Sequence, residues 1–294
     1  MNKVSKVLLI AALVVGFIFV PKNSVSSTEN SGTQLITISK NNTIVLNSEI
    51  NGESVAAVIS KAKELDAGLG GVKEKITGKR PLYLFLFSPG GSIQAGLELI
   101  EALKGLGRPV HTITLFAASM AFQLVQQLDD RYILRYGVLM SHHAMGQAEG
   151  EFGGSVKSQM ENRQQLWLDR VKELDEQTVK RTNGKQSYES YTKQYDHEMW
   201  LTGSVSTEQG YADKIVAVKC DPSLTGVTTH HVNFMGLDIA YDLDNCPLNT
   251  GAMNARVGLA NANDKVSSAT EEAIKQQFIV HYTNMTKRPL PMNW

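Results

Sequence analysis

Apolar positions along the chain follow two different periodicities. Six stretches alternate apolar and polar residues, or form short apolar runs, as β-strands do: 34–38, 43–47, 82–87, 109–115, 136–141 and 214–218. Between them apolar residues recur at helical spacing over 52–68, 92–107, 119–128 and 155–181. Strands that alternate with helices predict an α/β domain with mainly parallel strand pairing.

The first 27 residues have a different pattern. Two lysines precede an unbroken apolar run, Val7 to Val20. This run is shorter than the roughly 20 residues of a membrane-spanning helix, and its length is typical of a signal-peptide core. Ser24 and Ser26 follow at the spacing that a signal peptidase accepts. The pattern predicts export to a periplasmic or extracellular compartment, with an uncleaved membrane anchor as the alternative.

The chain therefore divides into four parts. Residues 1–27 are the signal peptide or N-terminal membrane anchor, 28–33 a polar linker, 34–220 the α/β domain, and 221–294 a C-terminal extension of unknown role. Lysine plus arginine equals aspartate plus glutamate, 29 each, so the charge balance gives no reason to expect a nucleic-acid partner.

The chain has two cysteines, Cys220 and Cys246. An even number of cysteines in an exported protein predicts a disulfide. Two unrelated buried thiols are the alternative.

Three predicted strands end in residues of chemical interest. Gly90 and Gly91 follow the strand at 82–87, and their exposed N–H groups could hold an oxyanion. Ser119 stands between a strand and a helix, and His142 or His143 ends the next strand. Each has an ordinary structural interpretation: a tight turn, a helix N-cap or a structural histidine. Together and in this order, they favour a serine nucleophile with a histidine base.

Four motifs carry a resemblance to a known family: "FSPGGSIQAGLELIEAL", "AASMAF", "GVLMSHHAMG" and "WLTGSVSTEQGYADKI". In this order and spacing they resemble the proteolytic subunit of ATP-dependent Clp protease, over about residues 34 to 218. The resemblance implies a crotonase-like α/β fold, a spiral of parallel βαβ units with a long projecting helix. The C-terminal extension is additional to the family's core.

The resemblance also implies roles for individual residues. Ser119 would be the nucleophile and His142 the base of a Ser-His-Asp triad. The N–H groups of Gly90, Gly91 and Met120 would form the oxyanion hole. The turn with the two glycines would also bind the substrate backbone as an added strand.

Two positions depart from the family's pattern. Alignment on "WLTG" places Glu198 where the family has the triad aspartate, and Asp196 two residues earlier is the alternative acid. Leu115 and Phe116 stand where the family has glycine and a polar residue, which would reshape the entrance to the site.

The predicted function is that of a serine endopeptidase that hydrolyses exported peptides or unfolded protein segments. The chain has no phosphate-binding Gly-x-x-x-x-Gly-Lys pattern, so it would act without an ATPase of its own, and it needs no cofactor or metal. The long helix carries Met160, Trp167, Val171 and Leu174 on one face. Such a face on a projecting helix predicts a homo-oligomeric ring.

Four other interpretations remain open. Lys157 could serve as the base of a Ser-Lys enzyme related to signal-peptide peptidases. A catalytically silent assembly protein could keep the same fold. A crotonase-like acyl-CoA enzyme would leave Ser119 and His142 unexplained. A metal site would need histidines whose spacing matches no known ligand pattern: His142, His143, His230 and His231.

Overall fold

The computed structural model describes residues 33–70, 79–145, 156–234, 237–249, 253–258, 272–274, 276 and 277. The predicted signal peptide or anchor at 1–27 lies outside these residues. Within the described part of the chain, no helix is both long enough and apolar enough to span a membrane.

A seven-stranded sheet forms the centre of the α/β domain. Six strands run parallel in the order β1-β7-β5-β4-β3-β2, and β6 pairs antiparallel with β5. Their bounds are β1 (Gln34–Ile38), β2 (Thr43–Leu46), β3 (Leu82–Ser88), β4 (Val110–Ala118), β5 (Arg131–Ser141), β6 (Met199–Thr202) and β7 (Lys214–Cys220). The mainly parallel α/β fold predicted from the sequence is confirmed.

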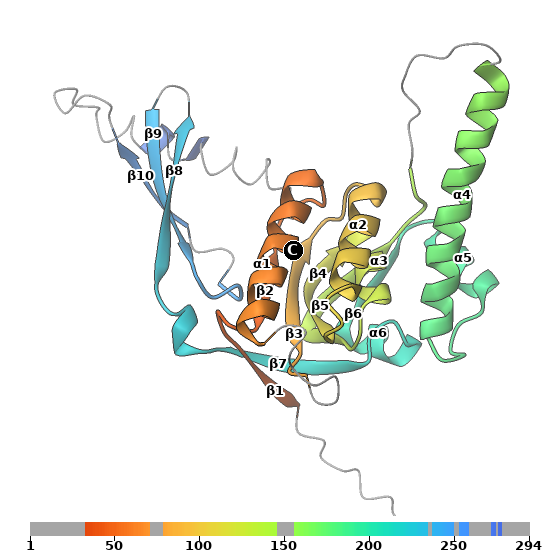
Figure 1. The fold of residues 1–294 in the computed structure, drawn as a ribbon, viewed down its shortest axis with the longest axis horizontal. Coiled ribbons are helices and arrows are strands. Elements are labelled where there is room, and N and C mark those ends of the chain that lie inside the picture. Colours follow the sequence, from red (N-terminus) through yellow and green to blue (C-terminus); the bar gives the residue numbers. More distant parts are fainter. Residues whose placement is uncertain are drawn as a thin grey trace, which may run out of the picture. The chain divides into compact units, whose positions relative to one another are not determined.

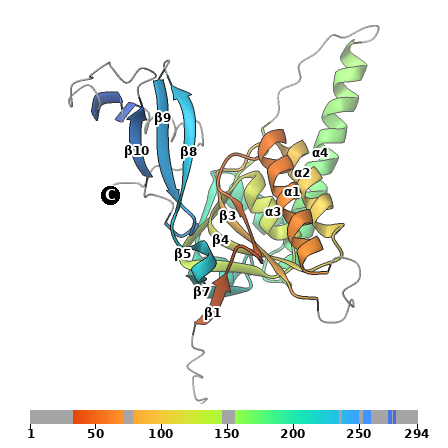
Figure 2. The same ribbon diagram turned by 60° about the vertical axis from the view of Figure 1, so that its left-hand side comes forward.

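Helices α1 (Gly52–Gly68), α2 (Ile93–Lys104) and α3 (Met120–Gln127) follow β2, β3 and β4, and they lie side by side (Figures 1 and 2). Asn51 and Ser92 cap the first two helices by accepting N–H hydrogen bonds. Alternate residues of β3 point to opposite faces of the sheet: Leu84 packs in the helix-side core and Phe85 in a second, smaller core.

Helices α4 (Val156–Arg181), α5 (Tyr188–Tyr195) and α6 (Gly203–Gln209) complete the domain. The long helix α4, green in Figure 1, is the one predicted at 155–181. Its apolar face is not uniformly exposed. Met160 is exposed, but Trp167 and Val171 are only half-exposed, and Leu174 is buried in the helix-side core. Of the face from which the ring was predicted, Leu174 is therefore covered by its own domain.

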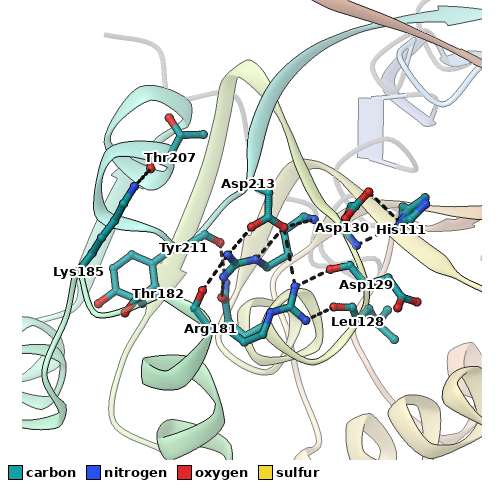
Figure 3. Close-up of polar contacts among 12 residues, drawn as sticks. His111, Leu128, Asp129, Asp130, Arg181, Thr182, Lys185, Thr207, Tyr211 and Asp213 are labelled. Atoms are coloured by element: carbon teal, nitrogen blue, oxygen red, sulfur yellow. Dashed lines mark hydrogen bonds and ion pairs between the residues drawn. The ribbon is translucent and has the colours of Figure 1, made fainter.

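A buried arginine joins α4 to the sheet. Arg131, at the start of β5, donates to both carboxylate oxygens of Asp213, at 2.6 and 3.1 Å, and to the side chain of Gln126. Arg181 at the end of α4 lies 3.8 Å from Asp213 and donates to the carbonyls of Leu128 and Asp129 (Figure 3). These contacts hold the C-terminal end of α4 against β5.

Residues after 220 form a small antiparallel sheet of their own. It contains β8 (Val227–Phe234), β9 (Leu237–Asp244) and β10 (Met253–Gly258), in the order β10-β9-β8, after a short 3₁₀ turn at Pro222–Leu224. A disulfide joins Cys220 at the end of β7 to Cys246 after β9, as the sequence predicts, with 5.9 Å between the two Cα atoms.

Candidate active site

The turn after β3 depends on its two glycines. Gly90 has φ of +91° and Gly91 of +143°, a region that other residues rarely adopt. A Cβ atom on Gly90 would lie 2.7 Å from the Cβ of Ser119 and 2.8 Å from the backbone nitrogen of Met120. Only glycine therefore lets this turn lie against the junction of β4 and α3.

Ser119 occupies that junction in a strained conformation. It is one of three non-glycine residues with positive φ in the described chain, at φ 55° and ψ −123°. Its N–H donates to the carbonyl of Met140 at 2.9 Å, and its own carbonyl accepts from Gln123 N–H at 3.2 Å. Such a turn costs on the order of 1–3 kcal/mol and is typical of functional sites. In α/β-hydrolases a sharp strand-to-helix turn exposes a serine hydroxyl at the edge of the sheet.

His142 reaches the same place from the neighbouring strand. β4 and β5 are parallel neighbours, and Ala118 pairs with Met140, so Ser119 and His142 follow adjacent strand ends. Both residues line one cavity of about 740 Å³. No hydrogen bond joins the Ser119 hydroxyl to the His142 imidazole in this structure. Catalytic hydrogen bonds are often long without substrate, so the pair remains a candidate.

Two of the three predicted oxyanion donors are available. The N–H groups of Gly91 and Met120 donate to no acceptor among the described residues. The N–H of Gly90 instead donates to the hydroxyl of Ser88 at 3.2 Å, and that hydroxyl donates to the carbonyl of Ser48. Gly90 therefore shapes the turn, while the N–H groups of Gly91 and Met120 have no acceptor in the described chain and both residues line the cavity.

The two candidate acids have other partners. The Glu198 carboxylate accepts a hydrogen bond from the indole N–H of Trp200 at 3.1 Å. Asp196 lies 2.9 Å from Nε2 of His143, not His142. In this structure neither carboxylate is hydrogen-bonded to His142, so the third member of the triad stays a prediction.

Aromatic side chains lie near the strand ends. Phe116 in β4 packs against Phe87 at 6.1 Å and against Trp200 at 6.4 Å between ring centroids. Phe116, which stands where the family has a polar residue, thus joins aromatic rings from β3 to β6 in one row. Leu115, the other departure, packs in the second, smaller core.

The remaining sequence candidates contribute little to this geometry. Within the described ranges, no group of three or more His, Cys, Asp or Glu side chains could hold a metal ion. His230 and His231 lie in β8 of the C-terminal sheet. The side chain of Lys157 lies outside the described part of the structure.

A buried carboxylate beside the cavity was not predicted. Asp175 of α4 accepts hydrogen bonds from the Tyr195 hydroxyl at 2.8 Å, the Gln123 amide at 3.1 Å and the Tyr191 hydroxyl at 3.3 Å. Burial raises the pKa of Asp175, and these hydrogen bonds act in the opposite direction. Burial also raises the pKa of Tyr195, and the charge of Asp175 raises it further.

Comparison with known proteins identifies the family of the chain. The family model described as "Clp protease" matches residues 27–219, well over half of the chain. The chain belongs to the Clp protease family. It is a serine-type peptidase, and its α/β fold is that of the Clp proteolytic subunits.

Several relatives are similar over most of their own length. The proteolytic subunit 3 of the ATP-dependent Clp protease from Synechococcus sp. (strain CC9605) is 27% identical over 177 residues, which are 59% of this chain and 82% of the relative. The subunit from Ligilactobacillus salivarius (strain UCC118) is 26% identical over 61% of this chain and 85% of its own. Subunit 2 from Prochlorococcus marinus (strain MIT 9313) is 30% identical over 47% and 68%.

Proposed function

We propose that the chain is an endopeptidase in which Ser119 attacks the peptide carbonyl and His142 takes its proton. The same imidazole then protonates the leaving amine, and water hydrolyses the acyl-enzyme by the reverse proton transfers. The N–H groups of Gly91 and Met120 stabilise the oxyanion. The observation that carries this proposal is the strained Ser119 turn, which faces one cavity with His142 and these two N–H groups.

The cavity suits a segment of polypeptide. Its wall on α4 includes the apolar side chains of Trp167, Val171 and Leu174, which could receive an apolar side chain of the substrate. The Ser119 turn and the N–H groups of Gly91 and Met120 line the same cavity, from the ends of β3 and β4. The substrate would therefore be an extended peptide or an unfolded segment.

We further propose that the enzyme works outside the cytoplasm and without an ATPase of its own. The support is the charged start and apolar run of residues 1–27, together with the disulfide between Cys220 and Cys246. Disulfides persist in oxidising compartments and are rare in the cytosol. Cell fractionation with N-terminal sequencing of the recovered protein tests this: a cytosolic protein that keeps Met1 would contradict export.

A ring of identical subunits is part of the proposal. Met160, Leu166 and Leu168 are large apolar residues of α4 that are 44–55% exposed in the single chain. Contacts between copies would cover them. Light scattering of the protein without residues 1–27 tests this, and a monomer at micromolar concentration would contradict the ring.

The decisive experiment is labelling with a fluorophosphonate probe, combined with hydrolysis of a fluorogenic peptide. Ser119→Ala should abolish labelling, and His142→Ala should lower kcat by about 10⁴–10⁶. His197→Ala is the matched control, because this histidine belongs to none of the proposed machinery. An active His142→Ala enzyme together with an inactive Lys157→Ala enzyme would replace the histidine by a Ser-Lys mechanism.

A further inference from the structure

The carboxylate of Asp175 is buried without an ion pair in the described chain to offset the cost of burying its charge. The residue is 3% exposed, and within the described chain no lysine or arginine lies within ion-pair distance of it. Its three hydrogen bonds come from neutral groups: the hydroxyls of Tyr191 and Tyr195 and the amide of Gln123. A buried carboxylate is costly to keep ionised unless it is paired, and here only hydrogen bonds from neutral donors offset that cost.

One of these donors connects Asp175 to the nucleophile. Gln123 lies one turn after Ser119 in α3, and its backbone N–H donates to the Ser119 carbonyl at 3.2 Å. Its side chain is held at both ends: the amide N–H donates to Asp175, and the amide oxygen accepts from the Thr178 hydroxyl at 3.0 Å. Two residues of α4 thus fix the first turn of the helix that carries Ser119.

The other two donors connect Asp175 to the histidines. The Tyr191 hydroxyl lies 3.2 Å from the hydroxyl of Ser141, the residue before His142. The Tyr195 ring packs edge-on against the His143 ring, with 4.7 Å between the centroids. The hydrogen bonds to Asp175 therefore fix α5 relative to the end of β5.

We propose that Asp175 is a positioning residue: its carboxylate holds α3, the end of β5 and α5 in the arrangement that brings the Ser119 hydroxyl and the histidine base together. This inference rests on the peptidase function proposed above. Asp175 acts through Gln123 and the two tyrosines.

The charge of Asp175 affects stability and activity in opposite directions. Burial raises the pKa of Asp175, so the folded protein binds this proton more tightly than the unfolded chain does, and stability falls as the pH rises above the unfolded pKa. The groups of the described chain that face it are neutral Gln123 from α3 and four titratable side chains from other elements: Tyr188, Tyr191, Tyr195 and His143. On α4 itself, its neighbour Glu176 pairs with Lys172 at 3.7 Å.

The test compares Asp175→Asn with its neighbour Glu176→Gln. Both changes turn a carboxylate into an amide on the same helix, but Glu176 is exposed and takes no part in the network. Asp175→Asn should unfold at the same temperature as the wild type or higher. Its kcat should fall by about 10²-fold, as for a small misplacement of reacting groups, with little change in KM. Glu176→Gln should match the wild type in all three quantities.

The pH dependence supplies a readout that a purely structural role would not change. The ratio of wild-type to Asp175→Asn kcat should fall toward one as the pH decreases, because a protonated aspartate and an asparagine are both neutral. Tyr195→Phe keeps the ring against His143 but removes one hydrogen bond to Asp175, so it should lower kcat in the same direction.

The outcomes separate this inference from the proposed function. If the wild type is not labelled by the fluorophosphonate probe, the peptidase function itself fails. If the wild type is labelled and Asp175→Asn is labelled at the same rate with the same kcat, the positioning role is wrong. A loss of kcat that is independent of pH, or that accompanies a lower unfolding temperature, would also overturn it.

Discussion

Gly90→Ala tests whether the turn after β3 supports the nucleophile. The new Cβ atom would overlap the carbonyl oxygen of Ala118 and lie 2.7 Å from the Cβ of Ser119 and 2.8 Å from the nitrogen of Met120. These atoms belong to the backbone or are bonded directly to it, so no side-chain rotation can relieve the contacts. The junction of β4 and α3 must move instead.

The expected loss of kcat in Gly90→Ala follows from the displacement of Ser119 and Met120. A left-handed conformation costs a non-glycine residue about 1–2 kcal/mol. Displacing Met120 N–H would remove one of the two proposed oxyanion donors, a loss that typically lowers kcat by about 10²–10³. A shift of Ser119 by about 1 Å adds a loss of similar size. We therefore expect kcat to fall by at least about 10³.

Gly184→Ala is the matched control. Gly184 has φ of +81°, and nothing lies within 4 Å of the Cβ atom that alanine would add. It carries the conformational cost without the overlap, so the control should lose stability and keep its kcat. The assay is hydrolysis of a fluorogenic peptide, with thermal unfolding followed by circular dichroism. A Gly90→Ala enzyme as active as the control would refute the argument.

Three further predictions concern the acids and the stability of the fold. Glu198→Gln should lower kcat more than Asp196→Asn does; the reverse order would assign the acid to Asp196, which pairs with His143 in the structure. Removing the disulfide by Cys246→Ser should cost on the order of 3 kcal/mol in denaturant unfolding, unless the protein was already reduced. Asp213→Asn should destabilise the fold by about 2–3 kcal/mol at neutral pH, below the range for a fully buried pair because Asp213 is 36% exposed. Burial tends to raise the pKa of Asp213, but the hydrogen bonds from Arg131 outweigh burial and lower that pKa. The stabilisation by the ionised carboxylate is therefore present above about pH 4 and is lost as the pH falls further. The difference between this variant and the wild type should therefore shrink in acid, and a difference that does not change with pH would contradict the assignment.

Periodicity predicted the parts of the fold that have regular patterns. β3 and β4 are apolar runs, and α2 has clear helical spacing, so their positions agree with the sequence to within a few residues. The sequence pattern did not predict separate elements in the segment that forms α5, β6 and α6. Its strand β6 has only four residues, and its helices are short and largely polar, so neither periodicity can be recognised.

The candidate site was predictable only as far as local sequence determines it. Ser119 and His142 follow from strand ends, because parallel strands bring such residues to one edge of the sheet. The contact that occupies Gly90 N–H depends on the rotamer of Ser88, which no pattern specifies. Asp175 looks like an ordinary surface acid in sequence, since its partner Gln123 lies 52 residues away and becomes a neighbour only in the fold.

Helix α4 contributes to two different surfaces of the molecule. Its first half presents exposed apolar side chains outside the cavity, Met160 and Leu166, and its later part, which includes Leu168, Leu174 and Asp175, walls the cavity. Consider a partner that binds the first half of α4 more tightly when the cavity has one particular conformation. By thermodynamic linkage, binding of that partner then favours this conformation of the cavity. Peptide binding and self-association would then be reciprocal: substrate would raise the affinity between subunits, and dilution would weaken substrate binding.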